Sequence, residues 1–381
     1  MIQSLLMNFQ DATWIEKKKT VDFQSDNAQL VLLFGSKTKI DNQQLFPSLK
    51  EKFPNAAIVF SSTSGEIINT QVNDDSLVLA ALQFEKTTLK VISTNILNHE
   101  SNSFEAGAEL FNQLDADNLA SIFIFSDGIL VNGGELVEGL NKNNTKGIII
   151  SGGLAGDGAN FSSTLTGLND TVKEGEIVAI GLYGSHLNIG HGSLGGWDEF
   201  GHEKTITKAD KNVLYELDGK NALSLYKEYL GPYANELPSS ALLFPLAIQT
   251  NENENLVRTI LTIDEEKSSM TFAGNMPVGQ KVRFMKANFD KLIQASELAA
   301  QTSVNISNVA KPDFALLVSC VGRKLVLQER IEEEVESAVE ILGNQCATIG
   351  YYSYGEISPL NSTSKCELHN QTMTITTLSE I

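Results

Sequence analysis

Three stretches of the chain follow the same plan, and this repetition limits the folds that the sequence can adopt. Each has an apolar run, an amphipathic run, a second apolar run and a glycine-containing turn, at residues 30–67, 122–157 and 314–357. The first and third end alike, with Ser-Gly-Glu-Ile at 64–67 and Tyr-Gly-Glu-Ile at 354–357. A recurring strand–helix–strand unit predicts an α/β fold with internal pseudo-symmetry. We therefore expect mixed sheets built from repeated β-α-β units, with the glycine turns gathered around one site.

The composition is that of a globular protein with a strong acidic excess. The chain has 381 residues, of which 42% are hydrophobic and 20% charged, enough for two domains with sizeable cores. The net charge of −19 would repel nucleic acid and anionic membranes, so we expect neither as a partner. A docking partner with a basic face would suit this charge, and so would solubility alone.

The sequence carries no mark of export or of a membrane span. The apolar stretch at residues 2–9 is interrupted by polar residues and lacks a basic region before it. No apolar run approaches the roughly 18 residues that cross a bilayer. The three cysteines lie far apart and suggest no disulfide framework. We expect a cytoplasmic protein that does not insert into membranes.

The expected architecture is two closely packed α/β domains, residues 1–210 and 211–381, because no long linker separates them. A helix is expected over residues 328–342, where apolar residues recur at helical spacing and Gly343 supplies a C-terminal cap. Its remaining face is acidic and includes Glu334. We expect that face to be solvated, with a docking surface as the alternative.

The two Gly-Glu turns are the first candidates for chemistry. A glycine after a buried strand allows a positive φ or the close approach of a ligand. Glu66 and Glu356 would then stand at the carboxyl ends of strands, where open α/β sheets bind ligands. They could pair across a pseudo-twofold axis and bind an amino group or a cation. Alternatively, each accepts hydrogen bonds from nearby amides and ties its turn.

The glycine-rich loop at residues 152–157 is a second candidate. It lacks the Gly-Lys-Ser/Thr ending of a P-loop and the spacing of a dinucleotide fingerprint. A ligand-lining turn is the better interpretation, with Gly153 allowing close backbone approach and Asp157 supplying a carboxylate.

Polar and aromatic residues of the third repeat complete the candidate ligand site. Arg323 could hold a carboxylate or form a salt bridge with Glu356, and its charge would favour the thiolate of Cys320. Cys320 is otherwise a small core residue, a ligand contact or a nucleophile. Alternation places Tyr352 and Tyr354 on one face, where they could line a pocket or pack in the core.

An ordered set of motifs along almost the whole chain resembles the FIST family. The set comprises Cys-x-x-Arg at 320–323 with Gly-Tyr-Tyr-Ser-Tyr-Gly-Glu-Ile at 350–357, Ser-Gly-Glu-Ile at 64–67, the 152–157 loop, Gly-Gly-Trp at 195–197, residues 217–222, 276–279 and 368–372. The resemblance implies a FIST N-terminal domain followed by a FIST C-terminal domain. It also implies a sensory, ligand-binding role in bacterial signalling.

Some stand-alone members resemble haem-containing nitric-oxide sensors that act on a histidine kinase or a cyclic-di-GMP enzyme. If haem b is bound here, a neutral imidazole could be its axial ligand, and His369 and His191 are the candidates. The sequence has no metal-ligand spacing and no covalent haem motif. Ordinary structural histidines are the alternative.

Several functions therefore compete at this stage. The first is a sensor whose ligand sits among the glycine turns, and a haem-free amino-acid-binding module is its alternative. A hydrolase that uses Cys320 or Ser64 and a purely interacting protein are the others. The hydrolase lacks a Gly-x-Ser-x-Gly elbow and a readable acid–base set, so we expect a protein that is not an enzyme.

Overall fold

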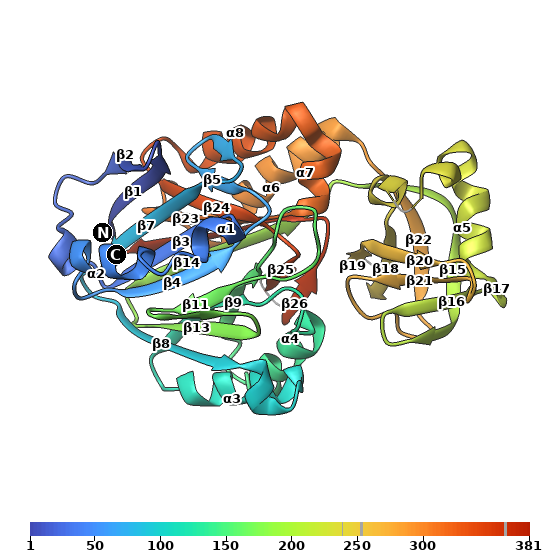
Figure 1. Cartoon of the computed structure of the whole chain (residues 1–381), viewed down its shortest axis with the longest axis horizontal. Helices are drawn as coiled ribbons and strands as arrows, with labels where there is room; N and C mark the ends of the chain where they lie inside the picture. Colours follow the sequence, from blue (N-terminus) through green and yellow to red (C-terminus); the bar gives the residue numbers. More distant parts are fainter. Residues whose placement is uncertain (238, 252–253, 362–363) are drawn as a thin grey trace.

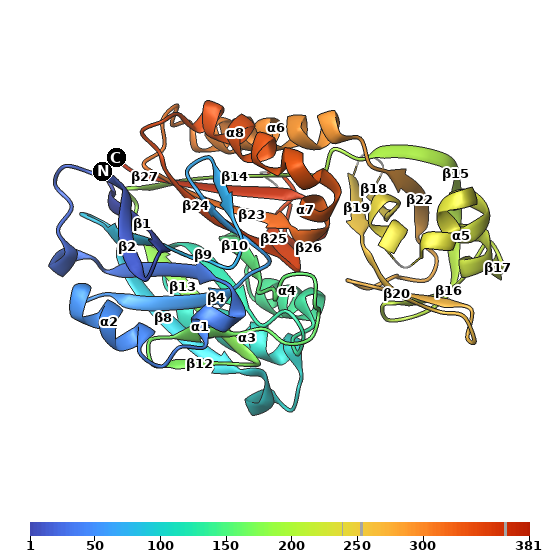
Figure 2. The ribbon, with the colours of Figure 1, turned by 45° about the horizontal axis from the view of Figure 1, so that its top comes forward.

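The computed structural model describes residues 1–237, 239–251, 254–361 and 364–381. The chain forms a large body from residues 1–197 and 287–381, and a smaller lobe from residues 198–286 that stands to one side of it (Figure 1). Both ends of the chain lie in the body, at the end away from the lobe (Figure 2). The predicted mixed α/β fold is confirmed.

The body contains three copies of one unit, each built on a parallel strand pair. The pairs are β3 (Leu30–Gly35) with β4 (Ala57–Ser62), β9 (Leu119–Ser126) with β10 (Ile149–Leu154), and β23 (Phe314–Cys320) with β24 (Ala347–Ser353). An antiparallel strand follows beside the first strand of each pair: β7 (Leu77–Gln83), β13 (Glu176–Tyr183) and β27 (Met373–Glu380). A further strand lies outside each of these: β1 (Gln3–Gln10), β8 (Thr88–Asn95) and β14 (Leu187–Leu194). The repeats read from the sequence are therefore repeats in space.

Each unit gives a hairpin to the sheet of another unit. The hairpin β5–β6 (Glu66–Ile68, Gln71–Asn73) pairs with β24, and β25–β26 (Gly355–Pro359, Cys366–His369) pairs with β10. The hairpin β11–β12 (Thr166–Leu168, Thr171–Lys173) closes the cycle by pairing with β4. The exchange runs from unit one to three, three to two and two to one. The three units are therefore related by a pseudo-threefold arrangement. The pseudo-twofold axis considered for Glu66 and Glu356 is wrong.

Helices cover the outer faces of the three sheets. They are α1 (Lys37–Ile40) and α2 (Leu45–Lys52) in the first unit, α3 (Ser103–Leu114) and α4 (Gly133–Lys142) in the second, and α6 (Phe289–Ser307), α7 (Val321–Leu327) and α8 (Ile331–Leu342) in the third. Short 3₁₀ helices are Ser25–Asn27, Ile96–His99, Gly231–Glu236, Ser239–Leu243 and Gln328–Arg330. Asparagine caps start α3, α4 and α6, because Asn102, Asn132 and Asn288 each accept a hydrogen bond from the amide three residues on.

The inner faces of the three sheets share one core. Phe34, Phe125 and Tyr351 come from different sheets and contact one another, with ring centroids 4.7 Å apart for Phe34 and Tyr351 and 5.6 Å apart for Phe34 and Phe125. Burial of each such side chain contributes about 1.5–3 kcal/mol. The segments 1–210 and 211–381 also share a sheet, since β14 of the first segment pairs with β27 of the second.

The lobe is an antiparallel sheet with an α-helix packed against it. Its elements are β15 (Asp198–Asp210), β16 (Val213–Leu217), β17 (Lys220–Asn221), α5 (Ala222–Leu230), β18 (Leu246–Asn251), β19 (Glu254–Arg258), β20 (Ile260–Asp264), β21 (Ser269–Phe272) and β22 (Lys281–Lys286). The remaining strand of the body, β2 (Thr13–Lys19), forms a hairpin with β1.

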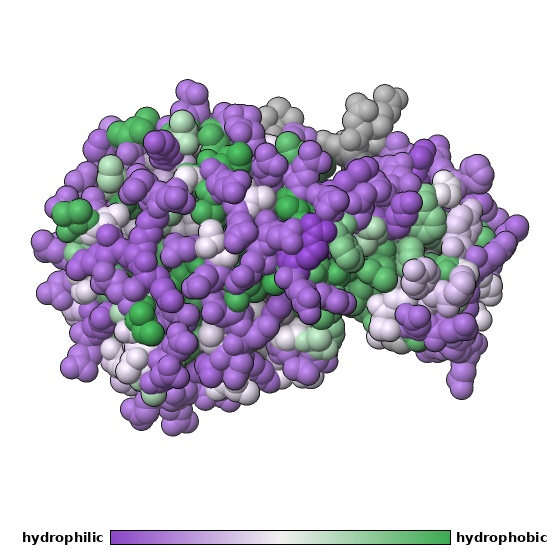
Figure 3. All heavy atoms as spheres, turned by 90° about the horizontal axis from the view of Figure 1, so that it is seen from above, coloured by the Kyte–Doolittle hydropathy of each residue, from purple (hydrophilic) through white to green (hydrophobic). Residues whose placement is uncertain are grey.

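The joint between lobe and body is apolar. Trp197, Leu292 and Val326 of the body pack with Val257 and Met285 of the lobe. In a view of the upper face, apolar residues gather where the lobe meets the body, while most of the remaining face is hydrophilic (Figure 3). The lobe is therefore held by a hydrophobic contact and not only by the two chain connections.

Candidate functional site

The turns at the ends of the parallel pairs are hydrogen-bonded to one another. The amide of Ser64 donates to the carbonyl of Tyr352 at 2.8 Å, and the amide of Tyr352 donates to the carbonyl of Gly65 at 2.8 Å. The amide of Gly156 donates to the carbonyl of Ser62 at 2.9 Å. The turn after β4 is thus hydrogen-bonded both to the end of β24 and to the loop after β10. This follows from the exchange of hairpins, which brings the first unit into contact with the other two.

A pocket of about 390 Å³ opens beside these turns, and we call it the turn pocket. Four segments line it: the end of β3 with α1, the turn after β4, the turn between β6 and β7, and the loop after β10. The lining residues are Ser36, Lys37, Thr38, Thr63, Ser64, Gly65, Glu66, Asp74, Asp75, Asp157, Gly158, Asn160 and Ser162. Among the predicted site residues, the pocket brings together Glu66 and Asp157.

Glu66 and Glu356 occupy equivalent places, and both are buried. Glu66 accepts hydrogen bonds from the amide and hydroxyl of Ser76 at 3.1 and 2.6 Å. Glu356 accepts them from the amide and hydroxyl of Thr372 at 3.2 and 2.9 Å. Ser76 and Thr372 each stand one residue before the antiparallel strand of their unit. Each carboxylate therefore ties its turn to that strand, and a ligand-binding role for either stays a prediction.

The second unit performs the same task with a different residue. Asp127, which follows β9, accepts a hydrogen bond at 3.1 Å from the amide of Gly175, one residue before β13. It also accepts one at 2.7 Å from the hydroxyl of Thr164. A carboxylate at this point is thus common to the three units, although only two of them supply it from a Gly-Glu turn.

Burial changes the acidity of the two turn glutamates. It raises the pKa of Glu66 to about 7 and that of Glu356 to about 8, although hydrogen bonds from neighbouring hydroxyl and amide groups act in the opposite direction. Glu66 is 1% exposed at the floor of the turn pocket, so its protonation state bears on the charge of that pocket.

Asp157 organises the loop after β10. Its carboxylate accepts hydrogen bonds from the amides of Phe161 at 2.9 Å and Ser162 at 3.1 Å, and from the hydroxyl of Tyr354. The rings of Tyr354 and Phe161 stack with centroids 4.5 Å apart. Burial alone would raise the pKa of Asp157, but hydrogen bonds from Tyr354, Ser162 and Ser163 outweigh it and hold the pKa below the ordinary value. Tyr354 therefore fixes one wall of the turn pocket from behind.

Two lysines bring positive charge to the turn pocket. Lys37, the first residue of α1, lines it directly. The ammonium group of Lys324 donates to the carbonyl of Ser64 at 2.8 Å and forms an ion pair with Asp74. Gly65, at φ +136°, leaves the space that this ammonium group fills, since a Cβ atom there would collide with it.

Arg323 lies outside the turn pocket, in a fully buried network. Its guanidinium group donates to Glu334 at 2.7 and 3.0 Å, to the carbonyl of Leu292 at 2.8 Å and to the carbonyl of Gly195 at 2.5 Å. The hydroxyl of Tyr352 donates to the same Glu334 at 2.9 Å. Glu334 is 0% exposed, so its expected place on a solvated face is wrong. A buried cation and a buried tyrosine hydroxyl need an acceptor there, which helical periodicity alone could not show.

Gly153 and Cys320 also sit within the packed core. A Cβ atom on Gly153 would lie 2.7 Å from a methyl group of Val318 and 2.9 Å from the carbonyl of Gly355, so glycine is required by strand packing. Burial, followed by the charge of Glu356, raises the pKa of the Cys320 thiol far above its ordinary value. The expected activation of the thiolate by Arg323 is therefore outweighed.

Comparison with known proteins places this geometry in a family. The model of the FIST N domain matches residues 29–220, and that of the FIST C domain matches residues 222–359. The chain belongs to the FIST family. FIST domains are associated with sensory signal transduction.

Two individual proteins are also similar to this FIST chain. An uncharacterized protein of Methanocaldococcus jannaschii, MJ1623, is 23% identical over 380 residues, which cover 86% of this chain and 70% of that protein. A solved structure described as "Cyanuric acid hydrolase: evolutionary innovation by structural concatenation" aligns over 100% of both chains, with a TM-score of 0.35 and 9% identity. At that level the second similarity supports no conclusion about fold or activity.

The turn pocket of the FIST chain belongs mainly to the FIST N segment. All of its lining residues fall within residues 29–220, while Lys324 and Tyr354 approach it from the FIST C segment. The two segments therefore meet at the pocket. Among the described helices, none combines the length and apolar character needed to cross a membrane.

The two haem candidates of the FIST chain lie in packed strands. His369 is 1% exposed, and its Nε2 is 2.8 Å from the carbonyl oxygen of Ser358. Burial lowers the pKa of His369 to about 4 and also lowers that of His191. Neither histidine lines the turn pocket, and both are at most 2% exposed, His369 on β26 beside β25 and His191 on β14 beside β27. These residues do not fit an axial haem ligand.

Several residues of the pocket were missed by sequence reasoning. Lys37 directly follows the first buried run and its Ser36, and Lys324 is the residue after the Cys-x-x-Arg motif, so both positions carried a usable signal. Asp74 and Asp75 lie between two strands of the first unit. Their role depends on the exchange of hairpin β5–β6, which no local pattern indicates.

Proposed function

We propose that this FIST protein is a sensor that binds a small dipolar molecule, such as an amino acid, in the turn pocket and passes the signal to a partner protein. The observation that carries the proposal is the meeting of cationic and anionic groups in one cavity of about 390 Å³, lined by turns from two different units. That volume suits a small molecule.

The charges of the pocket match a zwitterion. Lys37 lines one side, and Asp74 and Asp75 line another, with exposed fractions of 75% and 71% for their side chains. An ammonium group would replace water at these carboxylates, while a ligand carboxylate would approach Lys37. The hydroxyl groups of Ser36 and Thr38 add hydrogen-bonding capacity at the rim.

The pocket also gives a route from binding to signalling. Its walls contain the turn after β4, whose hairpin pairs with the third unit, and the loop that Asp157 and Tyr354 hold together. A ligand that orders these segments changes the contacts between units, and a partner that binds only one arrangement would respond. The net charge of −19 favours a partner with a basic docking face, and a histidine kinase or a cyclic-di-GMP enzyme is the kind that we propose.

A haem-free, non-catalytic protein is part of the proposal. The poor fit at His191 and His369 supports the absence of haem from its function. The hydroxyl of Ser64 donates to the carbonyl of Gly158 at 2.8 Å, and the thiol of Cys320 is buried with a raised pKa. Neither arrangement resembles an activated nucleophile.

The test is calorimetric titration of the purified protein with the common amino acids, next to an absorption spectrum after addition of haemin. We expect saturable binding of at least one amino acid and no stoichiometric Soret band. Lys37→Gln should weaken that binding about tenfold or more by removing a charge-assisted contact. The matched control is Lys19→Gln, an exposed lysine on β2. Stoichiometric haem binding, or equal affinities for Lys37→Gln and wild type, would contradict the proposal.

A further inference from the structure

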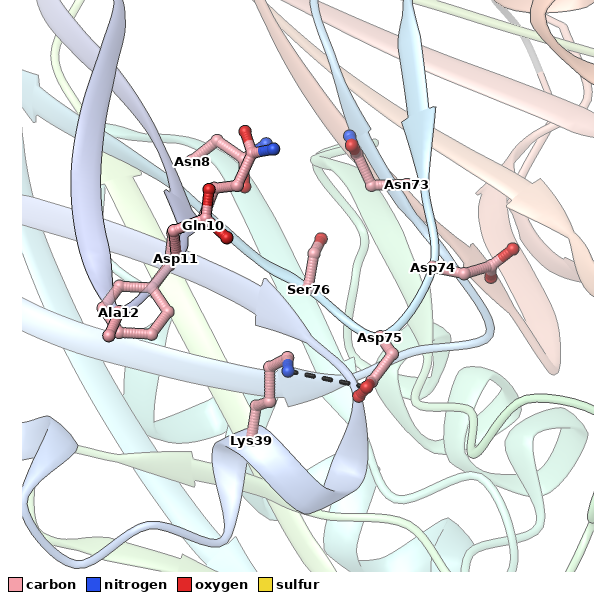
Figure 4. Close-up of a pocket in the computed structure, with 10 residues that line it drawn as sticks. Asn8, Gln10, Asp11, Ala12, Lys39, Asn73, Asp74, Asp75 and Ser76 are labelled. Carbon is pink, nitrogen blue, oxygen red and sulfur yellow. Dashed lines mark ion pairs between the residues drawn. The ribbon is translucent and has the colours of Figure 1, made fainter.

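A second pocket lies next to the first, between the tip of hairpin β1–β2 and the turn between β6 and β7 (Figure 4). We call it the hairpin pocket, and its volume is about 280 Å³. Its lining includes the polar and charged residues Asn8, Asp11, Lys39, Asn73, Asp74 and Asp75. Asn8 and Gln10 stand on one side, and Asn73, Asp74 and Asp75 stand on the other (Figure 4). The two sides come from different sheets, because β6 belongs to the hairpin given to the third unit.

Asn8 occupies a position where an apolar residue would be expected. It lies opposite Val78 in the register of β1 and β7, two residues beyond Leu6, and both Leu6 and Val78 belong to the inner core. Asn8 is 4% exposed, yet its Oδ1 atom has no hydrogen-bond partner in the part of the chain that the structure describes. Burial of an acceptor without a partner is unfavourable, so a ligand that donates a hydrogen bond to this atom is favoured.

Asn73 stands opposite with the complementary atom. Its Nδ2 atom is buried and also lacks a hydrogen-bond partner among the described residues. One wall of the pocket thus presents a free acceptor and the facing wall a free donor. A carboxamide group offers the matching pair, an N–H for Asn8 and a carbonyl oxygen for Asn73.

The mouth of the hairpin pocket is acidic. Asp11, Asp74 and Asp75 line it together with one cation, Lys39, whose ammonium group is 3.5 Å from Asp75. A hydrogen bond from Ser36 is the main cause that lowers the pKa of Asp75, so this carboxylate is ionised at neutral pH. Asp11, at the tip of hairpin β1–β2, has no ion-pair partner within the described ranges. Asp74 is paired with Lys324, so one net negative charge remains at the mouth, which favours a cation and opposes an anion.

We propose that the hairpin pocket is a second binding site, for a small ammonium compound that carries a carboxamide. The carboxamide bonds to Asn8 and Asn73 at the buried end, and the ammonium group lies against Asp11 and Asp75 at the mouth. Such a ligand bridges β1 in the sheet of the first unit and the hairpin β5–β6, which the first unit adds to the sheet of the third. Asp74 and Asp75 line both pockets, so the two sites adjoin, whereas Asn8, Asp11 and Asn73 belong to the hairpin pocket and not to the turn pocket.

The probe for this site is β-alaninamide, tested by isothermal titration at low salt. Three analogues each remove one feature: propionamide lacks the ammonium group, propylammonium lacks the carboxamide, and β-alanine replaces the amide with a carboxylate. β-Alanine is titrated into Lys37→Gln, because the turn pocket of the wild type is proposed to bind such a zwitterion. We expect saturable one-to-one binding of β-alaninamide. Each analogue should bind about tenfold more weakly or not at all, because each loses a charge-assisted or buried hydrogen bond.

Two variants separate a binding role from a structural one. Asn8→Leu removes the unpaired amide, so it should abolish binding of β-alaninamide without lowering the melting temperature. Asp11→Asn, on the exposed hairpin tip, should weaken binding while leaving the fold unchanged. Lys37→Gln, in the turn pocket, is the control that keeps wild-type affinity for β-alaninamide. Because it tests the other pocket, failure here leaves the amino-acid proposal untouched.

Three results would overturn the assignment. The first is equal binding of propylammonium and β-alaninamide, which indicates simple attraction of cations to acidic groups. The second is wild-type affinity in both Asn8→Leu and Asp11→Asn. The third is the absence of saturable binding of β-alaninamide.

Discussion

Replacement of Arg323 by methionine should cost the body a large part of its stability. Arg323 is 0% exposed and forms an ion pair with Glu334, whose carboxylate is also 0% exposed. Methionine fills a similar volume but leaves this carboxylate buried without its cation. Removal of one partner of a buried ion pair costs about 3–5 kcal/mol. The carbonyl oxygens of Gly195 and Leu292 lose their donors as well, so we expect a value of about 4–5 kcal/mol.

The assay is urea unfolding followed by tryptophan fluorescence and, in parallel, by far-ultraviolet circular dichroism. Trp197 reports on this region, because it stands two residues after Gly195, whose carbonyl accepts a hydrogen bond from Arg323. Its indole N–H is itself fixed, since it donates to the carbonyl of Gln371 at 2.8 Å. The matched control is Arg330→Met. Arg330 pairs with Glu333 at 2.7 Å on the surface, where such pairs contribute about 0–1 kcal/mol.

The double variant Arg323→Met/Glu334→Leu decides whether the loss comes from the unpaired charge. Without the carboxylate, no buried charge remains, so the double variant should be more stable than Arg323→Met alone. The reasoning is refuted if the free energy of unfolding of Arg323→Met lies within about 1 kcal/mol of the wild-type value. It is also refuted if the losses of stability from the two single substitutions simply add in the double variant.

Two further predictions concern pH and the loop after β10. Because burial raises the pKa of Glu66 to about 7 and of Glu356 to about 8, the folded state holds protons that the unfolded state releases. The stability that these two groups contribute is therefore lost as pH rises through 7 and 8. The lowered pKa of His369, about 4, has the opposite effect on stability, but mainly below about pH 6.5. The free energy of unfolding in urea should therefore be about 2–3 kcal/mol larger at pH 6.5 than at pH 8. Glu356→Gln should remove most of this difference. Tyr354→Phe deprives Asp157 of a hydroxyl donor and should destabilise the protein by about 1–3 kcal/mol, with faster amide exchange over residues 157–163; unchanged exchange there would count against Tyr354 as the support of this wall.

The cycle of exchanged hairpins explains why the candidate sites lie where they do. A hairpin that leaves one unit for another carries its flanking turns across the seam between sheets. The turn pocket and the hairpin pocket both include Asp74 and Asp75, which follow the exchanged β6. Ligands at such seams contact two units at once, which is the arrangement that a sensor needs if binding is to change how the units pack.

The sequence alone determined the local elements of this protein and their repetition. Apolar runs such as residues 30–34, 122–125 and 314–318 are strands of three equivalent pairs, and the helix ending before Gly343 is present as α8. These features depend on neighbours within a few residues, through side-chain periodicity and backbone caps. The positions of Glu66 and Glu356 in equivalent turns followed from the same repetition.

Only the tertiary structure decided which of these elements meet. Glu334 has the sequence surroundings of a solvated residue, yet it lies in the core because Arg323 and Tyr352 approach it from other elements. Arg323 stands next to Lys324, which reaches the turn pocket, but the side chains of Arg323 and Cys320 turn into the core. Hairpin exchange and the placing of buried charges depend on contacts between residues far apart in the chain. A local pattern gives the polarity of a face, and the partner that covers that face is fixed only when the sheets assemble.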